Sequence, residues 1–192
     1  MRALEHNYLE LRRVAPATAL MAVVKANAYG HGAIEVTRKL DSLGCAAFGV
    51  AIPEEGAALR EAGIIKPIAV LGGIFADQAP DIVELGLAPV VFDMTVARAL
   101  DRAAKNRRIT LNIHVKVDTG MGRLGIQPHD AASFFSELKG LENLRVEALL
   151  SHFAESEADD KEFSMSQLSA FRKTVEEIKR TGTTPGALEM AN

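Results

Sequence analysis

The chain has 192 residues, of which 48% are hydrophobic, and a formal net charge of −3. This length suffices for one sizeable core, and the charge pattern lacks the clustered basic face that a nucleic-acid-binding protein would need. The single cysteine, Cys45, lies in an apolar run, which excludes a disulfide framework and predicts a buried thiol. Neither a signal peptide nor a membrane-spanning run is found, so we expect a soluble cytoplasmic protein with no membrane or nucleic-acid partner.

Seven short apolar runs predict β-strands, and helical patterns lie between them. The predicted strands cover residues 19–25, 45–51, 66–73, 87–92, 111–118, 145–153 and 186–192. Amphipathic spacing and capping signals predict helices over residues 33–43, 53–63, 93–107 and 166–180. The alternation predicts a parallel sheet with crossover helices. Its steady spacing favours a (β/α) barrel over an open doubly wound sheet, and the sequence leaves the second possibility open.

The first predicted strand ends in the segment AVVKANAYGHG, residues 22–32, where one lysine follows an apolar run. Functional groups of parallel α/β proteins collect at the carboxyl ends of strands, which is where Lys25 would lie. An apolar wall or a nearby cation lowers the pKa of a lysine, and a neutral amine can form a Schiff base. Gly30 and Gly32 permit positive φ angles beside Tyr29. The alternative is a solvent-exposed lysine before an ordinary loop.

The fifth predicted strand, LNIHVKVD, is apolar on one face and polar on the other. Side chains alternate along a strand, so Asn112, His114, Lys116 and Asp118 share the polar face. Strands inside a parallel sheet are usually apolar on both faces, so this pattern indicates contact with water or a ligand. Either the strand lies at an exposed edge, or its polar face points into the mouth of a barrel.

The segment VDTGMGRLG, residues 117–125, follows this strand and contains Arg123. The planar guanidinium group of arginine suits a carboxylate or a ring oxygen. Lys116 and Arg123 would repel each other unless an acid or a chemical modification intervenes. His152 ends the sixth predicted strand, a position that favours a functional role without excluding a structural one. No residue spacing predicts a metal site.

The motifs AVVKANAYGHG, VKVDTGMGRLG and SHFAESEADD, with MAN at the end, resemble the N-terminal domain of alanine racemases. That family consists of fold type III pyridoxal-phosphate enzymes, and the resemblance covers essentially the whole chain. It implies an α/β fold, an incomplete (β/α)8 TIM-type barrel with about seven of the eight strands present. Residues 1–192 would form the N-terminal pyridoxal-phosphate-binding barrel domain, without its last strand and without the C-terminal β-domain.

The resemblance also implies roles for individual residues. Lys25 would bind pyridoxal 5'-phosphate covalently through its amine and would act as one of two catalytic bases. Arg123 would be the second catalytic residue, donating to the phenolic oxygen of the cofactor and orienting the substrate carboxylate. Lys116 matches a position that is often carbamylated, and the negative carbamate would hold Arg123. The other expected cofactor-binding residues are Tyr29, Leu71, His152 and Asn192.

The implied activity is the interconversion of L-alanine and D-alanine, supplying D-alanine for peptidoglycan, by a homodimer of the full-length protein. The tyrosine that serves as the opposite base would come from the missing β-domain of the other subunit. The chain alone is therefore expected to have negligible activity. A serine, lysine or broad-specificity racemase of the same fold is one alternative, and a non-catalytic pyridoxal-phosphate-binding barrel protein is another.

Overall fold

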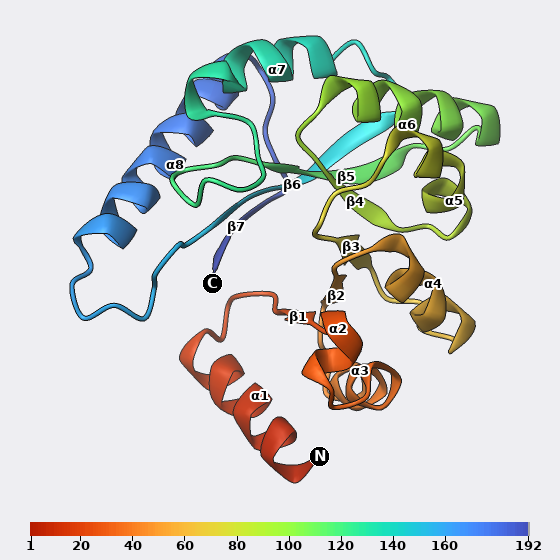
Figure 1. Ribbon diagram of the computed structural model, residues 1–192, viewed down its shortest axis with the longest axis vertical. Coiled ribbons are helices and arrows are strands. Elements are labelled where there is room, and N and C mark those ends of the chain that lie inside the picture. Colours follow the sequence, from red (N-terminus) through yellow and green to blue (C-terminus); the bar gives the residue numbers. More distant parts are fainter. Residues whose placement is uncertain (192) are drawn as a thin grey trace.

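The computed structural model describes residues 1–191, which form one α/β unit (Figure 1). Its strands are β1 (Met21–Val23), β2 (Ala47–Val50), β3 (Ile68–Val70), β4 (Ala88–Val91), β5 (Leu111–Lys116), β6 (Leu144–His152) and β7 (Ala187–Ala191). Its helices are α1 (Arg2–Val14), α2 (Lys25–Tyr29), α3 (Ala33–Ser42), α4 (Pro53–Glu61), α5 (Ala79–Glu84), α6 (Met94–Arg107), α7 (Ala131–Leu138) and α8 (Glu162–Arg180). Two 3-10 helices, η1 (Ala76–Gln78) and η2 (Pro128–Asp130), precede α5 and α7.

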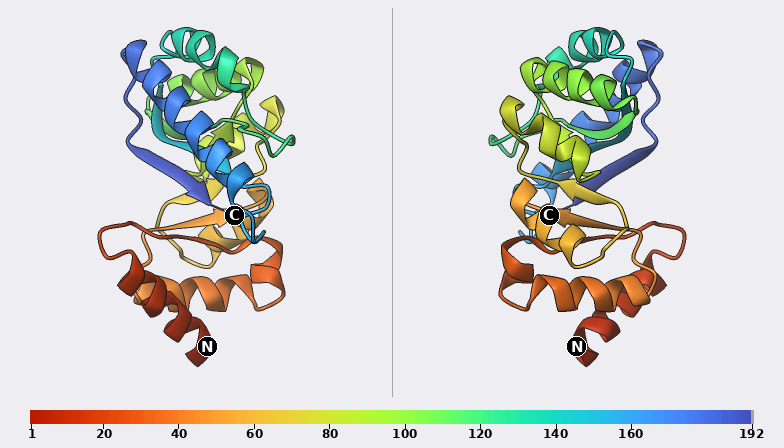
Figure 2. Two further views of the ribbon diagram at one scale, coloured as in Figure 1. Left: turned by 90° about the vertical axis from the view of Figure 1, so that its left-hand side faces the viewer. Right: turned by 90° about the vertical axis from the view of Figure 1, so that its right-hand side faces the viewer.

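The seven strands form one sheet in which each strand pairs in parallel with the next along the chain. A doubly wound sheet would reverse its strand order at a switch point, so this order excludes that alternative. The sheet is curled, and the crossover helices cover its outer face (Figures 1 and 2). Within the described residues, β1 and β7 each pair on one side only. The prediction of an incomplete (β/α) barrel is therefore confirmed.

The hydrophobic core lies between the outer face of the sheet and the helices. Large, fully buried side chains from both layers meet there, including Phe48, Ile113 and Leu149 of the strands and Leu100, Phe135 and Ile178 of the helices. Burial of each such side chain stabilises the fold by about 1.5–3 kcal/mol. Cys45 is also fully buried, as predicted, with its Sγ 3.3 Å from the carbonyl oxygen of Leu20.

The predicted helices are present with small changes at their ends. Asp93 caps α6 as expected, because its Oδ1 accepts hydrogen bonds from the N–H groups of Thr95 (2.7 Å) and Val96 (3.1 Å). Helix α8 begins four residues earlier than the predicted 166–180 segment, at Glu162 instead of Ser166. Helices α1, α5 and α7 were not predicted, and α5 and α7 span only six and eight residues.

Strand β5 lies inside the sheet, between β4 and β6, so the edge-strand interpretation of its polar face is wrong. Ile113 and Val115 pack into the core on the helix side, so the alternating residues point to the concave side of the sheet. Of these, His114 is 6% and Lys116 is 5% exposed. The polar face of β5 therefore lines the interior of the curled sheet.

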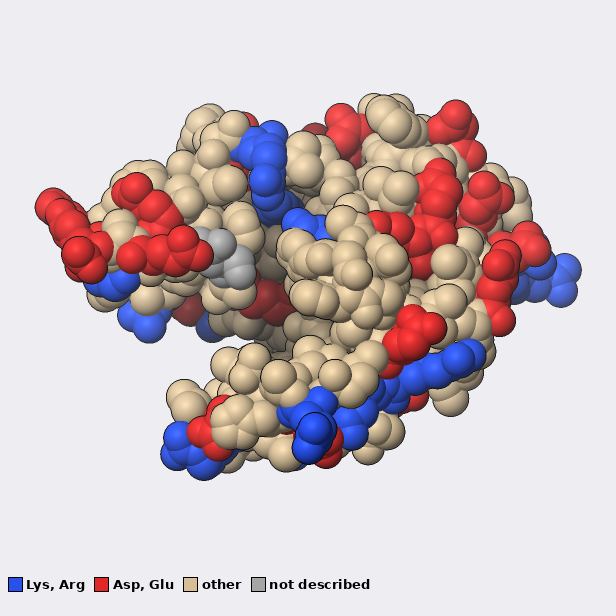
Figure 3. Space-filling view, turned by 60° about the horizontal axis from the view of Figure 1, so that its bottom comes forward, with Lys and Arg blue, Asp and Glu red and all other residues tan. Residues whose placement is uncertain are grey.

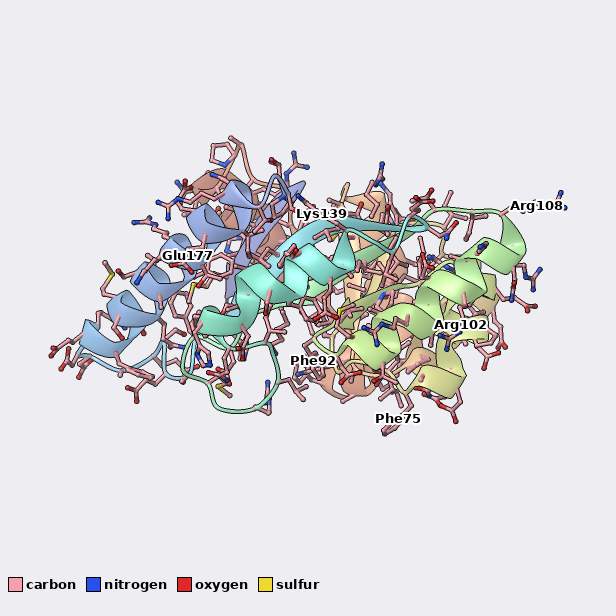
Figure 4. All side chains as sticks on the ribbon, turned by 90° about the horizontal axis from the view of Figure 1, so that it is seen from above. Phe75, Phe92, Arg102, Arg108, Lys139 and Glu177 are labelled. Atoms are coloured by element: carbon pink, nitrogen blue, oxygen red, sulfur yellow. The ribbon has the colours of Figure 1, made fainter. Side chains whose placement is uncertain are left out.

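The two ends of the strands are separated in Figure 4. Phe75 and Phe92 follow β3 and β4, and they are labelled in the lower part of the view. Arg108 and Lys139 precede β5 and β6, and they are labelled in the upper part. The lower side thus carries the carboxyl ends of these strands, where the predicted site residues follow. Among the described residues, no helix has the length and apolar character needed to cross a membrane.

Candidate active site

Lys25 follows β1 and begins α2, which is a left-handed turn. Ala26, Asn27, Ala28 and Tyr29 have φ angles of 51°, 54°, 52° and 54°. Left-handed backbone costs roughly 1–2 kcal/mol for each non-glycine residue, so the four together store on the order of 4–8 kcal/mol. The predicted positive φ angles of the two glycines after this turn are confirmed, at 87° and 89°. The turn itself was not predicted, because alanine and tyrosine give no sequence signal for it.

Hydrogen bonds hold the strained turn in place. The N–H of Ala28 donates to the carbonyl of Val24 (2.8 Å), and the N–H of Gly32 donates to the carbonyl of Asn27 (3.0 Å). The side chain of Asn27 accepts a further bond from the N–H of Ala33 (2.8 Å), the first residue of α3. The turn is thus tied both to β1 and to α3, which fixes the backbone that carries Lys25.

Lys25 is half-buried, and its Nζ lies 6.0 Å from the centre of the Tyr29 ring. Tyr29 itself is 63% exposed, so its hydroxyl is accessible to a ligand. Leu71 follows β3 and leans over β2, where Gly49 makes room for it. A Cβ at Gly49 would lie 2.8 Å from Cδ1 of Leu71. These residues place an amine and a phenol at the carboxyl end of β1 and an apolar side chain at the carboxyl end of β3.

Lys116 is buried at the carboxyl end of β5, and burial is the main cause that lowers its pKa. The charge of Arg123 lowers this pKa further, Asp118 raises it, and Lys25 lowers it again. The predicted repulsion between Lys116 and Arg123 is therefore present in the structure. Lys25, which follows β1, is thus close enough for its charge to act on Lys116 at the end of β5.

His152 ends β6 and belongs to the same group of residues. Burial lowers the pKa of its imidazole, and the charges of Lys116, Arg123 and Lys25 lower it further. The backbone of Ala191 acts in the opposite direction. The imidazole is therefore held in its neutral form at pH 7, in which a ring can lie flat against a planar ligand without adding a fourth positive charge.

The loop after β5 is shaped by Asp118, whose role was not predicted. Its Oδ1 accepts hydrogen bonds from the N–H groups of Gly120 (3.0 Å) and Gly122 (3.0 Å). Gly125 closes the loop at a φ of 134°, and a Cβ there would lie 2.6 Å from the N of Asp118. The loop backbone is therefore well defined, and it presents the exposed side chain of Arg123.

A buried glutamine supports this part of the site from the helix side. Gln167 of α8 is fully buried, and its Nε2 donates to the carbonyl of His152 (3.1 Å). Its Oε1 accepts from the N–H of Ala154 (3.0 Å). The neighbouring hydroxyl groups of Thr119 and Ser151 are 2.8 Å apart. Gln167 was also missed from the sequence, since an amide within an amphipathic helix gives no sign of what it contacts.

The three cations are not neutralised by ion pairs within the described residues, although the charge of Asp118 acts on Lys116. Within residues 1–191, no carboxylate forms an ion pair with Lys25, Lys116 or Arg123. The same part of the chain contains no group of three or more acidic, histidine or cysteine side chains placed to hold a metal ion. Figure 3 shows a hollow on the molecular surface, with both cationic and acidic side chains along it. Unpaired cations beside a primary amine suit an anionic carbonyl compound. The predicted site residue Asn192 lies outside the described residues.

Comparisons with known proteins relate the whole chain to one family. The family described as "Alanine racemase, N-terminal domain" matches residues 1–192. An alanine racemase of Geobacter sulfurreducens is 41% identical over 196 residues, covering 100% of this chain and 51% of the relative. The solved alanine racemase of Streptomyces lavendulae is 34% identical, with a TM-score of 0.94 over 100% of this chain and 51% of that chain. A histidine racemase of Leuconostoc mesenteroides is 26% identical, with a TM-score of 0.91 over 100% of this chain and 51% of that chain. The chain spans about half the length of the curated relatives it matches.

Proposed function

Since this chain belongs to the alanine racemase N-terminal domain family, we propose that it binds pyridoxal 5'-phosphate as the cofactor-binding half of an enzyme that interconverts L-alanine and D-alanine. The observation that carries the proposal is the proximity of the charges of Lys25 and Arg123 to Lys116, while none of the three forms an ion pair among the described residues. The donor set fits the group, because a primary amine suits its aldehyde and the cations suit its phosphate and phenolic oxygens. The bound cofactor withdraws electrons from the carbon that carries the amino group and so acidifies its proton.

The residues of this chain would divide the work as follows. Lys25 would hold the cofactor covalently through its Nζ until the amino group of the substrate takes its place, and the freed amine would then remove or return the proton on one face of the substrate. Arg123 donates to the phenolic oxygen and orients the substrate carboxylate. Tyr29 donates to the phosphate, while Leu71 and His152 line the cofactor.

Lys116 would carry a carbamate. Carbamate formation requires the neutral amine, which attacks carbon dioxide and loses a proton. The lowered pKa of Lys116 supports this role, because it increases the neutral fraction of the amine. The resulting negative charge would lie beside Arg123 and would remove the repulsion between the two cations.

Further parts of the proposal concern the whole protein. We propose that it works as a cytoplasmic homodimer, that a second proton-transfer group comes from outside this chain, and that the D-alanine produced serves peptidoglycan synthesis. The substrate side chain is the least constrained part, since a histidine racemase shares this barrel at a TM-score of 0.91. A racemase for serine, lysine or a broad range of amino acids remains the alternative, together with a barrel that binds the cofactor without turnover.

Titration of the purified chain with pyridoxal phosphate tests the proposal. We expect a visible absorption band from protein-bound cofactor, and fixation of the cofactor on Lys25 after borohydride reduction. Lys25→Ala should abolish both signals. Lys105→Ala, which changes an exposed lysine of α6, should leave them unchanged. A folded chain without the band, or a band that survives in Lys25→Ala, would contradict the proposal.

A D-alanine assay tests the division of labour. The chain alone, supplied with cofactor and L-alanine, should form no D-alanine above the level of the Lys25→Ala variant, because it provides only one of the two proton-transfer groups. Robust turnover by the isolated chain would show that both groups lie within residues 1–192.

A further inference from the structure

We propose that Glu55 is a positioning residue: its carboxylate ends the β1–β2 ladder and directs the chain into the left-handed turn that carries Lys25. Glu55 lies in the first turn of α4, and it is not one of the predicted site residues. The proposal rests on the proposed function in one respect only, namely that the orientation of Lys25 matters for cofactor binding.

The hydrogen bonds at the end of the ladder carry the argument. The last bond between β1 and β2 joins the N–H of Val24 to the carbonyl of Gly49 (2.8 Å). A continuing parallel ladder would next join the Ala51 N–H to the Val24 carbonyl and the Ala26 N–H to the Ala51 carbonyl. Instead, both N–H groups donate to Glu55, from Ala51 to Oε2 (2.7 Å) and from Ala26 to Oε1 (2.6 Å). One carboxylate therefore accepts both N–H groups of the next rung.

The carbonyl groups that this exchange releases have specific new partners. The carbonyl of Val24 accepts the N–H of Ala28 (2.8 Å), which is the first hydrogen bond of the left-handed turn. The carbonyl of Ala51 accepts the N–H of Gly72 (3.0 Å), which extends the pairing toward β3. Glu55 thus makes the turn possible in two ways. Its carboxylate accepts the N–H groups of Ala26 and Ala51, and it leaves the carbonyl of Val24 free for the turn.

Helix α4 holds the carboxylate firmly in this position. Arg60 of the same helix donates to four backbone carbonyl groups in the loops before β3 and β4, those of Ile64, Lys66, Leu85 and Gly86. The N-terminus of a helix also favours a negative charge in its first turn. A glutamine at position 55 would offer one acceptor oxygen and an NH2 group, and the latter cannot accept from an N–H.

Three variants of the chain test the proposal. Glu55→Gln keeps the shape of the side chain, and Glu55→Ala removes both acceptors. Glu54→Gln is the matched control, because Glu54 precedes Glu55 on the same helical turn, is exposed and carries the same charge. Circular dichroism establishes that each variant is folded, and Glu55→Gln decides the question if Glu55→Ala does not fold. Amide hydrogen exchange of Ala26 and Ala51 is measured without cofactor, so it does not depend on the proposed function.

We expect Glu55→Gln to accelerate exchange at Ala26 and Ala51 at least about tenfold over Glu54→Gln, the factor for one charge-assisted hydrogen bond. With pyridoxal phosphate, we expect binding to weaken by a similar factor and the reduced label to shift from Lys25 to other lysines. If Glu55→Gln exchanges faster at Ala26 and Ala51 but binds pyridoxal phosphate and labels Lys25 as before, the positioning role is overturned. Unchanged amide exchange in Glu55→Gln would overturn it as well. If the wild-type chain binds no cofactor, the proposed function fails, and exchange alone then decides whether Glu55 sets the turn.

Discussion

At the scale of single residues, the site is defined by positive charges that form no ion pairs among the described residues. Lys116 is buried, and the charges of Arg123 and Lys25 lower its pKa in addition to the effect of burial. Such a cluster destabilises the folded chain, because each charge raises the energy of the others. A bound anion or a carbamate would relieve this cost. Function and stability therefore oppose each other at Lys116, as is common at sites that bind charged ligands.

The lowered pKa of His152 leads to a prediction on pH dependence. An unfolded histidine titrates near pH 6.5, and the folded His152 titrates below that value. The unfolded state therefore binds more protons between the two pKa values, so the free energy of unfolding should decrease as the pH falls below about 6.5.

In an NMR titration, Lys116→Met should raise the pKa of His152, since it removes one positive charge. Lys105→Met should not change it, and an equal shift in both variants would contradict the assignment.

At the scale of elements, the left-handed turn α2 is the most strained segment described here. Ala26 is exposed and has a φ of 51°, whereas Ala58 is exposed in the right-handed helix α4. Glycine adopts the left-handed conformation without the cost that a Cβ imposes, but it destabilises an ordinary helix. The same substitution should therefore have opposite effects at these two positions.

Urea denaturation measures this difference. Ala26→Gly should raise the free energy of unfolding by up to about 1 kcal/mol, because the backbone strain released exceeds the added entropy of the unfolded chain. Ala58→Gly should lower it by about 0.5–1 kcal/mol. Equal losses in the two variants would show that the turn is not left-handed in solution.

At the scale of the whole molecule, the curled sheet has two open edges. Within residues 1–191, β1 pairs only with β2, and β7 pairs only with β6. A mainly apolar cavity of about 580 Å³ lies beside the β1 edge, and its lining includes Leu4, Leu11, Leu20 and Val23. On β7, Leu188 is 55% exposed. Unpaired edges with apolar side chains favour pairing between copies of a chain.

We therefore predict that the isolated chain associates in a concentration-dependent manner. Sedimentation velocity should show an average mass that rises with concentration, and Leu188→Lys should reduce this rise, because a charge at an edge strand opposes pairing. Ile65→Lys is the control, since Ile65 is 89% exposed but lies in the loop before β3. A monomer at all concentrations, or the same reduction by Ile65→Lys, would exclude the edges as the cause.

Local sequence patterns were enough to predict the seven strands, four of the eight described α-helices (α3, α4, α6 and α8) and the motifs around Lys25, Lys116 and Arg123, because these depend on local periodicity and residue type. Tertiary structure alone decided that β5 lies inside the sheet, that Ala26 to Tyr29 turn left-handed and that Glu55 closes the β1–β2 ladder. It also brought Lys25 and Arg123, from separate segments, close enough for their charges to act on Lys116. The physical reason is that these features depend on hydrogen bonds and charges between residues far apart in the chain, which no local pattern records.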